Sequence, residues 1–184
     1  MPSQTNPYAS LGFDAFFKVL RSHPECVLND ATHQPTIRPE HAMPNDLRAL
    51  YVHCGGLTLF PDIAFPVTIL PPERVALANP IITGLDRDEL IKLGAVAEAH
   101  PSWSAYTLAE DGNGDYFAID LGADRQGWCY DAHHERWPRA GDVTVLAYSF
   151  AGFLARMLWL IESRELPQRH WPSRLAELSL GSAF

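Results

Sequence analysis

Three residues of one turn, Asp111, Asn113 and Asp115, have the spacing of the first three ligands in an EF-hand calcium loop. Carboxylate and amide oxygens are the ligands that Ca²⁺ prefers. The rest of the loop does not follow, because the sixth position is Tyr116 where glycine is required and the twelfth is Gly122 where a bidentate glutamate belongs. The sequence excludes an EF-hand and leaves a weaker, non-EF cation site or solvated turn carboxylates as the interpretations.

Asp111 and Asp115 are also a carboxylate pair across a turn, the arrangement that general acid and base catalysis would need. A hydrolase that uses this pair is one hypothesis. Turn aspartates, however, flank strands in many non-enzymes, because their side chains bond the turn backbone. The sequence has no GxSxG, P-loop, HExxH or GxGxxG motif, so we predict no enzyme activity and no catalytic residue.

A pair of adjacent histidines, His133 and His134, lies near Cys129, Asp131 and Glu135, and all five side chains are of types that bind zinc. Their spacing matches no structural zinc pattern, and adjacent histidines in a loop do not easily face one ion. We therefore predict no metal site and no cofactor.

The cysteines Cys26, Cys54 and Cys129 are odd in number and form no CxxC pattern, which favours a reducing compartment over a disulfide framework. Cys54 stands before a Gly-Gly pair and could act as a nucleophile, but helical periodicity points it inward and predicts a buried, inert thiol. The first residues have neither a basic region nor an apolar core, and no run is long enough to span a membrane. We expect a cytoplasmic location without membrane contact.

Charge limits the class of partner. The net charge is −8, from 22 acids and 14 bases, and only Lys18 and Lys92 among the bases are lysines. Phosphate binding needs a clustered cationic surface, so nucleic acid is not expected as a direct ligand. A basic protein surface fits the charge better.

The acidic residues are concentrated in a predicted β-meander. Its four strands are expected at Trp103 to Ala109, Asp115 to Leu121, Gly127 to Asp131 and Val143 to Tyr148. Such short connections favour antiparallel pairing, because parallel neighbours need longer crossovers. Between Glu110 and Glu135 the sequence has seven acids and a single cation, Arg125.

Helical periodicity predicts the elements that hold this meander. Helices are expected at Phe13 to Leu20, Pro44 to His53, Asp86 to Ala99 and Phe150 to Ile161, and a shorter one begins at Pro172. Prolines beside Leu57 to Phe60 and Val67 to Leu70 favour brief edge strands or extended segments there over central strands. Residues 29–44 are expected to be irregular. We therefore predict one α+β domain over residues 1–184, an antiparallel sheet of four to six strands with N-terminal helices and a C-terminal helix packed on it.

The order of these elements resembles the SUKH superfamily, which contains the fungal cell-wall-assembly regulator and many bacterial toxin-immunity proteins. The likeness runs from Pro44 to Leu160 and rests on four motifs in order: MPNDLRALYVHCGG, DGNGDYFAIDL, GWCYD and SFAGFLARML. The family pattern maps mostly onto positions that form the fold, Pro44, Leu47, Tyr51, Gly55, Gly56, Gly114, Asp115, Tyr116, Asp120, Gly127, Tyr130, Phe150, Phe153 and Leu154.

The resemblance implies no catalytic constellation. It implies a protein that binds and neutralises a toxin, commonly a nuclease; the alternative is an intracellular regulatory or scaffold module of the same fold without a toxin partner. Aromatic anchors beside carboxylates are typical of a patch that faces an Arg/Lys-rich partner, and Trp137 in the loop HERWPRAG is the tryptophan expected to be exposed. The predicted partner-binding residues are Glu110, Asp111, Asp115, Asp124, Asp131, Glu135 and Trp137.

Overall fold

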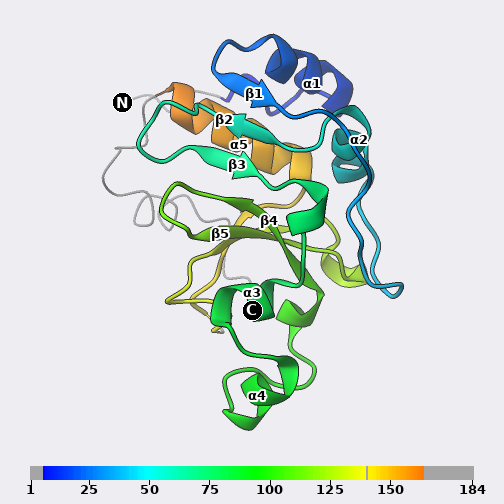
Figure 1. Cartoon of the computed structure of the whole chain (residues 1–184), viewed down its shortest axis with the longest axis vertical. Coiled ribbons are helices and arrows are strands. Elements are labelled where there is room, and N and C mark those ends of the chain that lie inside the picture. The colour runs from blue at the N-terminus through cyan, green and yellow to red at the C-terminus, as the bar shows by residue number, and fades with distance from the viewer. Residues whose placement is uncertain (1–5, 140, 164–184) are drawn as a thin grey trace.

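The chain folds around a seven-stranded antiparallel sheet whose strands follow one another in space in the order of the sequence (Figure 1). The structure is a computed structural model and describes residues 6–139 and 141–163. The strands are β1 (Cys26–Leu28), β2 (Leu57–Leu59), β3 (Val67–Ile69), β4 (Ala105–Glu110), β5 (Tyr116–Asp120), β6 (Cys129–Ala132) and β7 (Thr144–Ala147). The α+β class and the antiparallel meander are confirmed.

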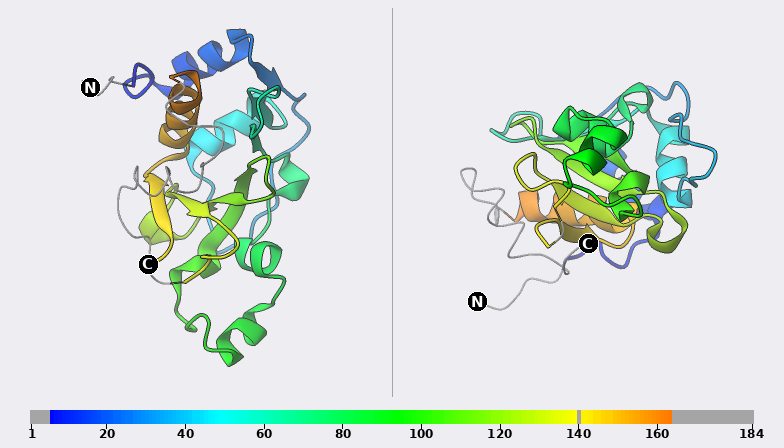
Figure 2. Two further views of the ribbon diagram at one scale, coloured as in Figure 1. Left: turned by 90° about the vertical axis from the view of Figure 1, so that its left-hand side faces the viewer. Right: turned by 90° about the horizontal axis from the view of Figure 1, so that it is seen from below.

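Helices cover both faces of this sheet (Figure 2). They are α1 (Phe13–Ser22), α2 (Asn45–His53), α3 (Ala78–Thr83), α4 (Arg87–Lys92) and α5 (Phe150–Glu162), with short 3₁₀ turns η1 (Pro72–Arg74), η2 (Pro101–Ser104) and η3 (Ala123–Arg125). Figure 2 shows α5 and α3 on opposite sides of the sheet, and α4 projects at the end far from α1.

Strand alternation builds a separate core on each face. On β5, Phe117 and Ile119 join the larger core with α1, α2 and α5, whereas Ala118 between them joins a smaller core with α3. On β6, Tyr130 likewise faces the smaller core, because successive strand side chains point to opposite faces. Both faces of the meander are thus buried.

The α5 helix forms where the sequence predicts it. The Ser149 hydroxyl accepts the Gly152 backbone N–H at 3.1 Å and caps the start of the helix. The Asp46 carboxylate from α2 accepts the Ala151 N–H at 2.8 Å, so a second helix also satisfies this helix start. The apolar stripe that includes Phe153 and Leu154 is fully buried against the sheet.

Local features also fix the end of α2 and both ends of α4. Gly56, at φ +109°, follows α2 where a Cβ atom would come within 2.7 Å of the Ile69 carbonyl oxygen, so the Gly-Gly pair lets the chain pass close to β3. The capping box of Asp86 and Glu89 starts α4. That helix ends at Lys92 instead of Ala99, because the chain turns at Gly94 with φ +66°.

The sheet is larger than the predicted four to six strands. Its extra strand is β1, in a segment where no strand is predicted, and β1 pairs with β2. The prediction that the proline-flanked segments at 57–60 and 67–70 form edge strands is wrong, since β2 and β3 lie inside the sheet. Pro61 and Pro66 stand just outside the paired residues and remove no ladder hydrogen bond.

Residues 29–44 contain no helix or strand, as predicted. The helix expected from Pro172 lies outside the described residues. Within the described part of the chain, no helix is long and apolar enough to cross a membrane.

Candidate partner-binding site

The β4–β5 turn and the β6–β7 loop meet at one end of the sheet. Glu110 pairs with Tyr116 across the hairpin, and Tyr116 pairs with Ala132 on β6. The turn is closed by Asp111, whose Oδ1 accepts the backbone N–H groups of Asn113 at 2.8 Å and Asp115 at 3.1 Å. Local turn chemistry therefore positions Asp115 beside the following loop.

Asp115 is held by both histidines of that loop. Its Oδ1 accepts the His134 backbone N–H at 3.0 Å and the His134 Nδ1–H at 2.7 Å, and its Oδ2 lies 3.2 Å from His133 Nε2. The two imidazole rings stack with centroids 4.7 Å apart. The hydrogen bond to Asp115 and its negative charge raise the pKa of His134. Contrary to the expectation for adjacent histidines, both rings face one group.

Two of the predicted binding acids are paired with arginines inside the molecule. Arg74 donates from both terminal nitrogens to Glu110, at 2.9 and 2.6 Å. Asp131 is 6% exposed and forms an ion pair with Arg136; burial raises its pKa, and the Arg136 charge opposes that shift. Both arginines lie outside the segment from Glu110 to Glu135, which is why the local charge count misses them.

The prediction that Trp137 is exposed is wrong. Its side chain is 3% exposed and belongs to the smaller core, where its ring lies 6.4 Å from that of Tyr130. The indole Nε1–H donates to Asn79 Oδ1 at 2.8 Å, so α3 satisfies its polar atom. The loop folds back over the second face of the sheet, a long-range contact without a local sequence signal.

Asp124 is exposed but lies at the opposite end of β5 from the turn. It stands in η3, next to Arg125, which forms an ion pair with Asp120 at 3.3 Å, and near Gln126, which donates to the Ala42 carbonyl at 2.8 Å. The structure therefore separates Asp124 from the other predicted binding residues.

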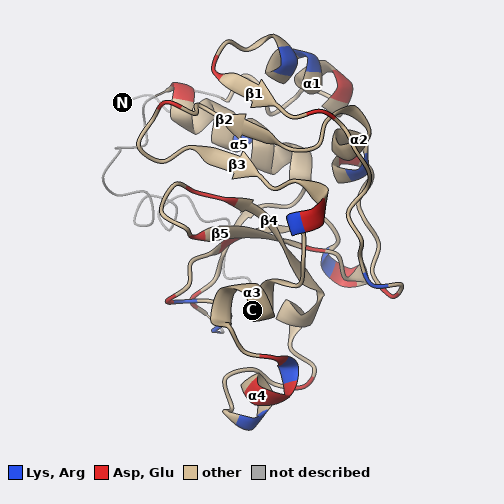
Figure 3. Ribbon diagram, in the orientation of Figure 1, with Lys and Arg blue, Asp and Glu red and all other residues tan. Residues whose placement is uncertain are grey.

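The turn end keeps an excess of negative charge (Figure 3). Five acids carry formal negative charges here: Glu110, Asp111, Asp115, Asp131 and Glu135. Arg74 and Arg136 carry two positive charges, so the net charge is −3 when the histidines are neutral. We call these five acids, together with His133 and His134, the turn-end cluster. Asp111 is 5% exposed and burial raises its pKa, so among the acids of the cluster Glu135 is the one with an exposed side chain.

The geometry gives no support to the catalytic alternatives. The carboxylate of Asp111 is committed to its own turn backbone, and that of Asp115 to two histidines. Cys54 is 1% exposed, and burial raises the pKa of its thiol, whereas an activated nucleophile needs a lowered one.

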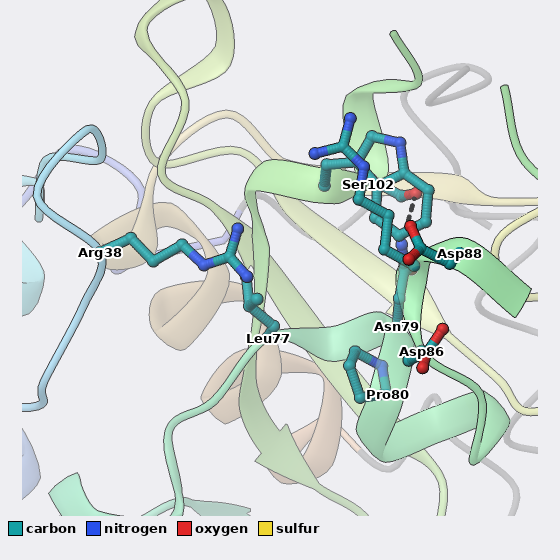
Figure 4. Close-up of a pocket in the computed structure, with 9 residues that line it drawn as sticks. Arg38, Leu77, Asn79, Pro80, Asp86, Asp88 and Ser102 are labelled. Carbon is teal, nitrogen blue, oxygen red and sulfur yellow. Dashed lines mark hydrogen bonds between the residues drawn. The ribbon is translucent and has the colours of Figure 1, made fainter. Parts of the chain in front are cut away.

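A pocket of about 320 Å³ opens beside α3, α4 and η2 (Figure 4). Its lining comes from four separate segments: Arg38, Leu77, Asn79, Pro80, Asp86, Arg87, Asp88, Ser102 and Trp103. The Arg87 guanidinium lies 5.2 Å from the centre of the Trp103 ring. No sequence pattern predicts this pocket, because its residues are far apart along the chain.

A meander sheet with the Gly-Gly helix and the Ser-capped α5 defines a fold of the SUKH type, and comparison with known proteins agrees. The chain matches the SMI1 / KNR4 family (SUKH-1) over residues 41–156 and belongs to that family. It is 33% identical over 175 residues to the protein described as immunity protein YokJ of Bacillus subtilis (strain 168). The alignment covers 95% of this chain and 96% of the relative. No solved structure matches the chain at a significant level.

Proposed function

We propose that this chain is an immunity protein that binds a cognate bacterial toxin in the cytoplasm and neutralises it by occluding its active surface. The observation that carries the proposal is the near full-length similarity to a protein described as an immunity protein. Membership of the SUKH-1 family is consistent with it. The toxin class that fits best is a nuclease, whose substrate-binding surface is basic.

The contact that we assign to the toxin is the turn-end cluster. Its net −3 charge complements a basic surface, and Glu135 and His134 are exposed there. Rigid support comes from the hairpin pairing and from the bonds between Asp115 and the β6–β7 loop. A preorganised acidic edge loses little conformational entropy on binding. The proposal involves no catalytic step and no contact with nucleic acid or membrane.

Co-expression tests the proposal. The neighbouring genes are expressed one by one, alone and together with this chain, and growth is measured. One neighbour should be toxic alone and harmless beside this protein, and the two proteins should co-purify. If no neighbour is toxic, or if the toxicity persists, the immunity function is wrong.

A pulldown from the native cell separates this function from the regulatory or scaffold alternative. An immunity protein should recover an effector that inhibits growth when produced alone. Recovery of housekeeping proteins, without any toxic product, would support a regulatory or scaffold module of the same fold.

A further inference from the structure

Three metal-ligating side chains converge where the β4–β5 turn meets the β6–β7 loop. Asp115, His133 and His134 each offer one ligand atom, and these atoms all lie within 4.8 Å of one another. The side chains of Asp115 and His133 are only 12% and 15% exposed, whereas that of His134 is 63% exposed. The cluster is therefore held on one side by the protein and open to solvent on the other.

One ligand pair already has the spacing found around zinc. Zinc binds histidine nitrogen and carboxylate oxygen at about 2.0–2.2 Å, so two ligands of a tetrahedral ion lie about 3.3 Å apart. Asp115 Oδ2 and His133 Nε2 are 3.2 Å apart. With Oδ2 as the ligand of the ion, the 2.7 Å hydrogen bond between His134 Nδ1 and Asp115 Oδ1 must break so that Nδ1 can turn toward the ion. The exposed His134 ring has room for that movement.

We propose that Asp115, His133 and His134 bind one divalent ion of the zinc class. Imidazole and carboxylate ligands suit Zn²⁺, and three protein ligands leave a fourth position for water or for a group from another molecule. The acids of the turn-end cluster add favourable charge around a dication. This inference rests on side-chain geometry and does not depend on the proposed immunity function.

Binding requires a rearrangement at each histidine. His134 Nδ1 donates its proton to Asp115 Oδ1, so that proton must move to Nε2 before Nδ1 can bind the ion. His133 Nδ1 accepts the Glu135 backbone N–H at 3.2 Å, so the ring carries its proton on Nε2. Ligation through Nε2 moves the proton to Nδ1 and breaks that hydrogen bond. Glu135 is exposed, so water can take its place. The His134 backbone N–H can keep its bond to Asp115 Oδ1 while Oδ2 binds the ion.

Titration of Zn²⁺ into the full chain without a polyhistidine tag, followed by calorimetry, tests the site. We expect one equivalent to bind. His134→Gln removes an exposed ligand, and Asp115→Asn keeps an oxygen acceptor for the turn but loses the charge; each should weaken binding roughly tenfold or more. His33→Asn, which removes an exposed histidine from the 29–44 segment, is the matched control and should bind as the wild type does.

Two controls make the outcome decisive. Thermal unfolding without metal establishes that each variant is folded before its affinity is compared. Co²⁺ in place of Zn²⁺ should give a spectrum without a thiolate-to-cobalt absorption band, because no cysteine belongs to the site. Absence of Zn²⁺ binding by the wild type, equal affinities in the two site variants and the wild type, or a thiolate band would each overturn the proposal.

Discussion

At the scale of single residues, burial separates carboxylates that build the fold from those that can meet a partner. Asp120 is 1% exposed, and its carboxylate is hydrogen-bonded and ion-paired inside the protein. Ser104 donates its hydroxyl at 2.7 Å, Tyr130 donates its hydroxyl at 3.0 Å, and Arg125 lies 3.3 Å away. A buried charge is tolerated when it is paired and hydrogen-bonded in this way. Asp120 therefore fixes the β5–β6 connection and is not available to a ligand.

A half-buried residue, His100, has a defined protonation state. The Ser102 backbone N–H donates to its Nδ1 at 3.2 Å, and the Ser102 hydroxyl lies 2.9 Å from the same atom. Since a backbone N–H can only donate, Nδ1 must lack a proton. Burial, followed by the Arg125 charge, lowers the pKa of His100, which agrees with a neutral ring.

His100 should make the folded state sensitive to mild acid. Its folded pKa is below the unfolded value, so the unfolded chain takes up a proton first as pH falls through about 6.5. The stabilising contribution is complete above that pH and decreases below it. The variant His100→Asn keeps an acceptor for Ser102 but cannot titrate. Between about pH 7 and pH 5, its free energy of unfolding, measured with urea, should fall less than that of the wild type.

His33→Asn is again the matched control for this measurement, since His33 is exposed. Its loss of stability over the same pH interval should equal that of the wild type. A wild-type slope in the His100 variant would show that His100 does not titrate differently in the folded and unfolded states.

At the scale of elements, the structure divides the acidic meander into two ends. Glu135 stands at the turn end and Asp124 at the opposite end of β5, and both side chains are exposed. The same charge reversal at the two positions changes the net charge equally but changes the field at different places. This pair therefore tests which end faces the toxin.

Glu135→Lys should slow association with the cognate toxin roughly several-fold at low salt, and the effect should shrink as salt screens the charges. Asp124→Lys should change the rate much less. Stopped-flow or surface-based association rates over a salt series provide the measurement. Equal effects of the two variants, or a Glu135→Lys effect that does not depend on salt, would contradict a contact at the turn end.

Sequence patterns predict the elements whose signals are local. The β5 strand and the α2 and α5 helices all appear where the sequence places them, because their patterns depend on neighbours within a few residues. The candidate site was only partly predictable. The bond from Trp137 to Asn79 joins residues 58 positions apart, and Arg74 reaches Glu110 across 36. Such contacts depend on the assembled fold, so composition and periodicity cannot reveal which side chains they bury.

At the scale of the whole molecule, the sheet is stabilised from both faces, and the two cores differ in size. The larger core contains the buried side chains of α1, α2 and α5. The smaller core consists of small side chains around two large aromatic ones, Tyr130 and Trp137. In the smaller core, Trp137 connects the β6–β7 loop to α3 through its bond with Asn79. The loop that carries His133, His134 and Glu135 of the turn-end cluster is thereby anchored to the α3 side of the sheet.

This arrangement predicts a large effect from one substitution outside the larger core. Trp137→Ala should lower the free energy of unfolding by about 3–5 kcal/mol, because it removes a buried aromatic side chain and leaves a cavity. Trp137→Phe keeps most of the packing and loses the bond to Asn79, so we expect a cost of about 1–3 kcal/mol. Leu93→Ala, at a side chain that is 68% exposed, should stay within about 0.5 kcal/mol of the wild type. Urea unfolding measures all three, and a Trp137→Ala cost no larger than that of Leu93→Ala would show that the smaller core does not hold the molecule together.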